Sequence, residues 1–272
     1  MEQHFVILLS KMWEFALALL MCRGVGANFE AVPLILGQDD RGFTFLGLTG
    51  LGQVVGIADS GVDDGSVFLQ DPSNTSTPRD GIVHPSRRKI VQYTPFASTA
   101  EGMDTVDGSG HGTFISTSIA GASYLTHSAY QRFNGVAPAA RIAMFDLESV
   151  TGQLHIPSNV TTIFETNSRA GARVHSNSWG GPIPETQLSS LAQDIDGWLY
   201  ANQDHVVIFA AGNGGSPASI SLPANAKNII SVGATQVREL FTDVRLHQQH
   251  VASFSSRGPT PDGRRAPVVV AP

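Results

Sequence analysis

The sequence is poor in cysteine and in charge. Its 272 residues contain a single cysteine, Cys22, and only 15% of them are Asp, Glu, Lys or Arg. One cysteine excludes an internal disulfide and a cysteine-based zinc site. The 17 basic residues are outnumbered by 23 acidic ones, and the longest basic run is 87–89. A nucleic-acid-binding face needs clustered positive charge, so we expect no nucleic acid partner.

Long apolar runs are absent as well. The apolar stretches at 5–9 and 15–21 are separated by Lys11 and Glu14, and neither approaches the roughly 20 residues that a spanning helix needs. We therefore predict no stable membrane span. The stretch at 15–21 and the small residues before a cut after Ala27 are typical of a signal peptide. The alternatives are an amphipathic helix that packs on the domain and a stretch that results from a mis-assigned start.

This pattern sets the expected domain organisation. Residues 1–27 are a possible signal peptide or N-terminal hydrophobic segment, and 28–46 are a linker or propeptide remnant. A cleaved signal would place the protein outside the cell or within the secretory pathway. No composition break or internal repeat divides 47–272, so one domain is expected there. The sequence carries no signal for an oligomeric state.

From residue 53 onward, short apolar runs alternate with helical patterns. This alternation is typical of repeated βαβ units and predicts an α/β protein with a parallel sheet. The polar stretches 72–89 and 236–250 are expected to be surface insertions. The predicted strands cover 53–58, 141–145, 173–177, 206–211 and 228–232, and the predicted helices cover 112–122, 159–170 and 186–202.

Three residues whose side chains can take part in catalysis lie at the ends of predicted strands or the starts of predicted helices. Asp59 follows the first predicted strand, His111 lies between glycines at the start of a helix, and Asn213 lies between glycines after a later strand. Each has a structural alternative, namely a turn former, a solvated turn histidine and a left-handed turn asparagine. Functional groups of parallel sheets collect at the carboxyl ends of the strands. An acid, a base and an amide donor at such ends therefore favour a common site.

Several longer motifs carry a resemblance to a known family. From about Gly47 to Pro272 the chain resembles the subtilisin-like serine proteases (subtilases, peptidase S8), which implies a three-layer α/β/α fold with a mostly parallel central sheet. The motifs are IADSGVD (57–63), GSGHGTFISTSIAG (108–121), GVAPAARIAMFD (135–146), HSNSWG (175–180), FAAGNGG (209–215), KNIISVGAT (227–235) and FSSRGPTPDGRRAPVVVAP (254–272).

The resemblance implies a role for each matching residue. Asp59 would orient the base, His111 would take a proton from a serine and deliver it to the leaving amine, and Asn213 would donate to the oxyanion. The implied partner is a polypeptide substrate, held in part as an added strand. The implied substrate-binding residues are Ser178, Trp179, Gly180, Ala211 and Gly212.

The nucleophile motif of the family, Gly-Thr-Ser, is missing from the 272 residues. We therefore expect 47–272 to be a peptidase domain truncated before its serine, with a fold incomplete at the C-terminus. The chain would then be inactive alone and marginally stable, because its sheet would lack a covering helix. The alternative is a catalytically inactive relative that serves as a peptide-binding or regulatory module.

The sequence assigns no cofactor or metal site. The resemblance makes calcium possible, but Asp63, Asp64 and Asp71 show no ligand spacing and are interpreted as solvated surface acids. Two positions depart from the family pattern. Phe114 stands where a second histidine is usual, and Val268 stands where an acid is common.

Overall fold

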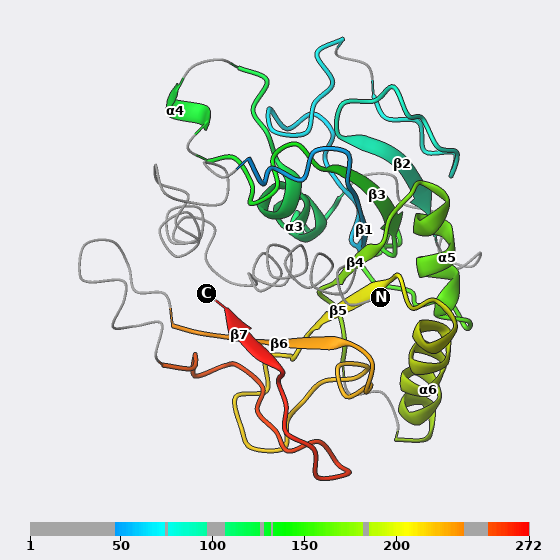
Figure 1. Ribbon diagram of the computed structural model, residues 1–272, viewed down its shortest axis with the longest axis vertical. Coiled ribbons are helices and arrows are strands. Elements are labelled where there is room, and N and C mark those ends of the chain that lie inside the picture. Colours follow the sequence, from blue (N-terminus) through cyan, green and yellow to red (C-terminus); the bar gives the residue numbers. More distant parts are fainter. Residues whose placement is uncertain are drawn as a thin grey trace. The chain divides into compact units, whose positions relative to one another are not determined.

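The computed structural model describes residues 47–73, 76–96, 107–125, 128–131, 133–181, 185–236 and 250–271 (Figure 1). The chain divides into two compact units, here called the N-terminal unit (Leu48–Asn177) and the C-terminal unit (Ser178–Pro272). The expected segments 1–27 and 28–46 lie outside the described residues, so their assignments stay predictions. Within the described ranges, no helix is long and apolar enough to cross a membrane.

The N-terminal unit is built on four parallel strands in the spatial order β2-β3-β1-β4. The strands are β1 (Val54–Asp59), β2 (Ile90–Pro95), β3 (Arg141–Asp146) and β4 (Val174–Asn177), and the helices are α3 (His111–Ala120), α4 (Ser128–Gln131) and α5 (Thr161–Arg169). Figure 1 shows α3 and α5 on either side of β1 and β3. Helices therefore cover both faces of this parallel sheet.

The central strand β1 is buried on both faces. Val55, Ile57 and Ala58 are each at most 1% exposed. Strands covered by helices on both sides read as continuous apolar runs, which is why β1 was predictable from its sequence. In the parallel register, Asp59 of β1 lies beside Asp146 of β3. Polar residues are thereby gathered at the carboxyl edge of the sheet.

The C-terminal unit has three parallel strands, β5 (Val206–Ala210), β6 (Ile230–Ala234) and β7 (Val269–Ala271), and helix α6 (Glu185–Ala201). The helix buries Leu191, Ile195 and Leu199, which belong to the apolar stripe that the sequence shows. Trp198 packs edge-on against His205, with 4.8 Å between the ring centroids. The aromatic residue of the stripe thus serves helix packing.

Every strand and helix predicted from the sequence is present, with its ends displaced by no more than two residues. The sequence prediction missed β2, α4 and β7. Gln92 interrupts the apolar pattern of β2, yet it is fully buried because its Nε2 donates to the Gly81 carbonyl at 2.9 Å. The assignment of 72–89 to the surface is partly wrong, since Thr77 and Lys89 are buried. The insertion 236–250 lies almost entirely outside the described residues.

Candidate active site

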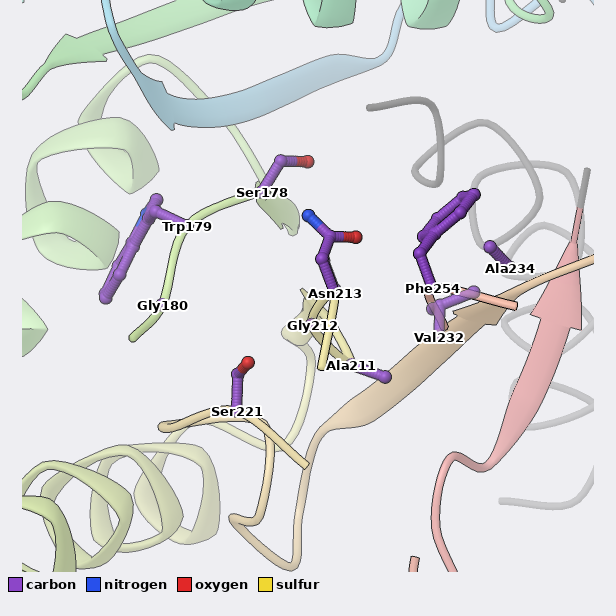
Figure 2. Close-up of a pocket in the computed structure, with 11 residues that line it drawn as sticks. Ser178, Trp179, Gly180, Ala211, Gly212, Asn213, Ser221, Val232, Ala234 and Phe254 are labelled. Atoms are coloured by element: carbon purple, nitrogen blue, oxygen red, sulfur yellow. The ribbon is translucent and has the colours of Figure 1, made fainter. Parts of the chain in front are cut away.

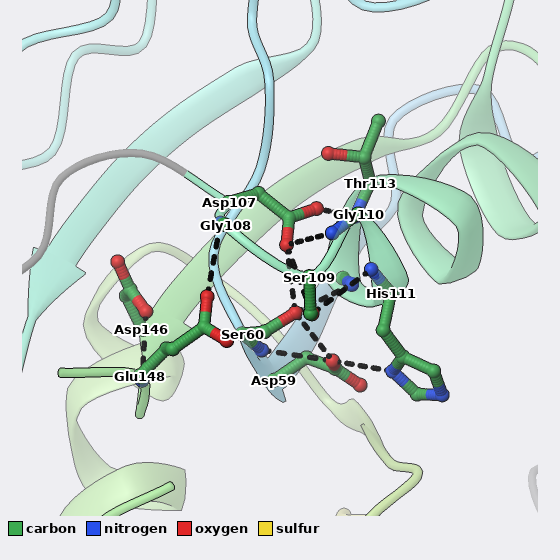
Figure 3. Close-up of polar contacts among 11 residues, drawn as sticks. Asp59, Ser60, Asp107, Gly108, Ser109, Gly110, His111, Thr113, Asp146 and Glu148 are labelled. Atoms are coloured by element: carbon green, nitrogen blue, oxygen red, sulfur yellow. Dashed lines mark hydrogen bonds and ion pairs between the residues drawn. The ribbon is translucent and has the colours of Figure 1, made fainter. Parts of the chain in front are cut away.

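Asp59 and His111 form the centre of the candidate site in the N-terminal unit. Asp59 ends β1, and its side chain is 2% exposed, whereas His111 begins α3, and its side chain is 31% exposed. The imidazole Nδ1 lies 2.6 Å from Asp59 Oδ1, as drawn in Figure 3. A buried carboxylate at Nδ1 fixes the tautomer of the ring and favours its protonated form. The predicted proximity of the two side chains is therefore observed.

Glycine is needed on each side of His111 for a different structural reason. Gly110 adopts a φ of 74°, the left-handed conformation that glycine takes without steric cost. Gly112 packs against the segment that follows β1, and a Cβ there would lie 2.0 Å from the Gly61 carbonyl oxygen. Only glycine permits this approach, which brings the start of α3 close enough for His111 to reach Asp59. His111 is thus the first residue of a helix and not a solvated turn histidine.

Three further polar residues line the carboxyl edge of the same sheet, and the sequence analysis did not identify them. The Tyr93 hydroxyl donates to Asp146 Oδ2 at 2.6 Å, and Glu148 Oε2 accepts from the Gly108 amide at 3.0 Å. Burial, reinforced by the Asp146 carboxylate, raises the pKa of Tyr93. The alternation of Asp146 and Glu148 at the end of a buried strand was the available signal.

Another residue missed by the sequence analysis is Asp107, which is 9% exposed and lies four positions before His111. Its carboxylate accepts hydrogen bonds from the amides of Gly110 and Thr113 and from the Ser60 hydroxyl. An acid shortly before a helix start was the signal that could have found it.

The predicted substrate-binding residues lie in the C-terminal unit and share one pocket. Its volume is about 200 Å³, and Figure 2 shows the Asn213 side chain among the residues that line it. The lining residues are Ser178, Trp179, Gly180, Ala210, Ala211, Gly212, Asn213, Ser221, Val232, Ala234 and Phe254. The five predicted binding residues and the predicted oxyanion donor are therefore brought together. Their part in the same reaction as Asp59 and His111 stays a prediction.

The pocket walls are held by close packing contacts. Gly212 has a φ of 106°, and a Cβ there would lie 1.8 Å from the Ser221 Oγ, so glycine is required. Trp179 is buried against Phe209, with ring centroids 5.0 Å apart. The left-handed alternative for Asn213 is wrong. Among the described residues, Ala218 alone of the non-glycine residues has a positive φ, and Gly212 makes the turn before the asparagine.

The interpretation of three acids as solvated surface residues holds for Asp63 but is wrong for the other two. Asp64 lies 3.6 Å from Arg79, and Asp71 lies 3.8 Å from Arg87, all with less than a fifth of the side chain exposed. Within the described part of the chain, no group of three or more His, Cys, Asp or Glu residues could hold a metal ion. The expectations on calcium and on cofactors stay predictions.

Comparisons with known proteins place this chain in a family. The sequence model of the Subtilase family (Peptidase S8) matches residues 50–272. The serine protease/ABC transporter B family protein tagD of Dictyostelium discoideum is 38% identical over 194 residues, which make up 70% of this chain and 10% of that protein. The chain thus spans about a tenth of the length of this curated relative.

Two solved structures share the fold. The CspB protease of Clostridium perfringens superposes with a TM-score of 0.63 at 15% identity, covering 92% of this chain and 80% of that one. The psychrophilic subtilisin-like protease Apa1 of Pseudoalteromonas sp. AS-11 gives a TM-score of 0.51 at 23% identity, over 79% and 42%. The fold is therefore a subtilisin-like α/β fold. The family match covers most of the chain, so this chain belongs to the subtilase family.

Proposed function

We propose that this chain carries the acid and the base of a serine endopeptidase that cleaves peptide bonds by acyl transfer. The single observation that carries the proposal is the 2.6 Å contact between His111 Nδ1 and the buried Asp59 carboxylate. A serine hydroxyl is a weak nucleophile until an imidazole accepts its proton. In this proposal His111 accepts that proton and later passes it to the leaving amine, and Asp59 stabilises the charged ring.

The pocket of the C-terminal unit would hold the substrate and the oxyanion. Asn213 is exposed at the pocket, so its carboxamide is accessible to a ligand. In the proposed reaction its N–H group donates to the negative oxygen of the tetrahedral intermediate. Ser178, Trp179 and Gly180 offer a backbone segment that an extended polypeptide could join as an added strand. Ala211 and Gly212 would form the opposite wall.

The proposal assigns no nucleophile within the 272 residues. The Gly-Thr-Ser motif does not occur among them. We therefore expect the 272-residue chain alone to form no acyl-enzyme and a longer product of the same gene that includes the motif to form one. The chemistry of Asp59 and His111 involves only proton transfer and electrostatic stabilisation, so no cofactor is proposed for this step.

Labelling with a fluorophosphonate probe tests the proposal. The longer product should be labelled, its His111→Ala variant should lose the label, and a His250→Ala variant should keep it, because His250 is an exposed residue far along the chain from α3. The 272-residue chain should remain unlabelled. A coding sequence that stops after residue 272, or a longer product that is not labelled, would contradict the proposal.

The missing motif favours one second candidate, a catalytically inactive subtilase-like module that binds peptides or regulates another protein. In that case the 272-residue chain would bind extended peptides in a calorimetric titration. Secretion is proposed as well, on the apolar stretch 15–21 that precedes Ala27. N-terminal sequencing of the mature protein should then begin at Asn28.

A further inference from the structure

Asp107 lies where the connection after β1 meets the start of α3. Its Oδ1 accepts from the Gly110 amide at 2.9 Å and from the Ser60 hydroxyl at 2.8 Å, and its Oδ2 accepts from the Thr113 amide at 2.7 Å. The Ser109 hydroxyl also donates to Oδ1, at 3.4 Å, so four donors hold this carboxylate, which belongs to a side chain that is 9% exposed, in one orientation.

Asp107 has two structural functions, and the first is to cap α3. The N-cap residue of α3 is Gly110, which has no side chain to satisfy the free amides of the first turn. Such amides need an acceptor, and a negative charge beside them also interacts favourably with the helix dipole. Asp107 supplies both to the Thr113 amide from outside the helix, while the Ser109 and Ser60 hydroxyls accept from the amides of His111 and Gly112. The position of the first turn, and so of His111, then depends on this carboxylate.

The second function is a bridge to the catalytic acid. Ser60 follows Asp59 directly, and its amide donates to Asp59 Oδ1 at 2.8 Å. The Ser60 Oγ accepts from the Gly112 amide at 2.8 Å and donates to Asp107. The distance from the Ser60 Oγ to Asp59 Oδ1 is longer, at 3.3 Å. The Ser60 hydroxyl therefore donates its hydrogen bond to Asp107. Figure 3 shows this chain of contacts running from Asp59 through Ser60 to Asp107 and back to α3.

The surrounding charges are mainly negative. Asp146 and Glu148 are buried at the same sheet edge, Glu148 contacts the Gly108 amide, and Asp146 lies beside Asp59 in the strand register. The nearby cation is Arg79, whose guanidinium lies 4.2 Å from the centre of the Tyr93 ring. Removing the charge of Asp107 therefore takes away one of several carboxylates that favour a protonated imidazole.

We propose that Asp107 is a positioning residue that holds His111 against Asp59, through the Ser60 hydroxyl and the first-turn amides of α3. The inference rests on the proposed function of Asp59 and His111. It assigns the alignment of the proton-transfer pair to a third acid that touches neither substrate nor reacting atoms. A displacement of a catalytic group by about 1 Å can lower a rate about a hundredfold, so such a residue is essential to the rate.

The test compares Asp107→Asn with Asp196→Asn. Asp196 is a matched control, because its carboxylate also accepts several backbone amide bonds, from Lys227 and Asn228, in the C-terminal unit. In the longer, active product, Asp107→Asn should lower kcat by about 10-fold to 100-fold and leave KM unchanged. The control should change neither.

A second readout uses the 272-residue chain and needs no activity. Its histidine ring resonances, followed by NMR with selectively labelled histidine, report the titration of His111. Asp107→Asn should lower the titration midpoint of His111 by about half a pH unit or more and weaken the downfield Nδ1–H resonance. The control Asp196→Asn should leave both as they are. Asp59→Asn should remove the downfield resonance altogether.

Ser60 provides an independent variant if Asp107→Asn does not fold. Ser60→Ala removes the bridge but keeps the Asp107 cap, and Ser60→Thr keeps a hydroxyl. We expect the alanine variant to lower kcat and shift the His111 titration, and the threonine variant to restore both. The inference is overturned if Asp107→Asn and Ser60→Ala lower only the melting temperature. If Asp59→Asn leaves the His111 resonances unchanged, the proposed function itself fails.

Discussion

We expect Lys89 to make the stability of the N-terminal unit depend on pH at neutral and alkaline values. The residue is 3% exposed, and its Nζ donates to the carbonyl of Pro138 at 2.9 Å and to that of Ala140. Among the described residues, no carboxylate forms an ion pair with it. Burial, followed by the nearby charges of Arg88 and Arg141, lowers the pKa of Lys89 to about 7.

The sign of the effect follows from proton binding. In the unfolded chain a lysine titrates near pH 10.4, so between about pH 7 and pH 10 the unfolded chain holds a proton that the folded chain lacks. The free energy of unfolding should therefore rise with pH by up to about 1.4 kcal/mol per unit. Over this window the gain is on the order of 4 kcal/mol, a large part of the stability of a domain. Below about pH 7 both states are protonated, and the dependence disappears.

Urea unfolding at several pH values between about 7 and 9.5 measures this slope. Lys89→Met keeps the unbranched stem and removes the charge, so the difference between the wild type and this variant isolates Lys89 from all other titrating groups. The wild type should gain stability relative to Lys89→Met as the pH rises. Lys227→Met, at an exposed lysine, should follow the wild type. Parallel curves for the wild type and Lys89→Met would contradict the lowered pKa of Lys89.

Two further predictions concern the candidate active site. Gly112→Ala should destabilise the chain by about 2 kcal/mol or more in a thermal melt, because its Cβ would lie 2.0 Å from a backbone carbonyl oxygen. Gly197→Ala, at a helical glycine with open space around it, should instead be neutral or stabilising by up to about 1 kcal/mol, and equal effects would contradict the close contact. Tyr93→Phe should cost about 1 to 3 kcal/mol in urea unfolding, because Asp146 loses its 2.6 Å hydroxyl donor in a buried site. Tyr200→Phe, at an exposed tyrosine, should leave the free energy of unfolding unchanged. An unchanged free energy of unfolding for Tyr93→Phe would contradict the hydrogen bond from Tyr93 to Asp146.

The features that were predictable from the sequence are those that a short segment determines alone. The apolar run of β1 requires burial on both faces, and the glycines around His111 mark a helix start that another chain segment approaches closely. For the same reason Asp59 and His111 were identifiable as candidates. That the two side chains lie close together was an expectation that depended on the parallel sheet. The structure shows the contact, with 2.6 Å between His111 Nδ1 and Asp59 Oδ1.

The features that the sequence did not show depend on distant partners. Lys89 belongs to a basic triplet that is typical of a surface, and only the carbonyls of Pro138 and Ala140 explain its burial. Asp107 resembles an ordinary loop acid until the Ser60 hydroxyl and the α3 amides are in place. The structural alternative for Asn213, a left-handed turn asparagine, is wrong because the preceding Gly212 takes the positive φ.

The strand order of the N-terminal unit also has a consequence for biosynthesis. Of the four strands of the N-terminal unit, β1 is translated first. Both strands that pair with it, β3 and β4, come much later in the chain. A nascent polypeptide therefore leaves the ribosome with the apolar sequence VVGIA and two unpaired strand edges exposed. Pairings over such long sequence separations form slowly, so this segment is where a chaperone would bind during synthesis and where aggregation would begin without one.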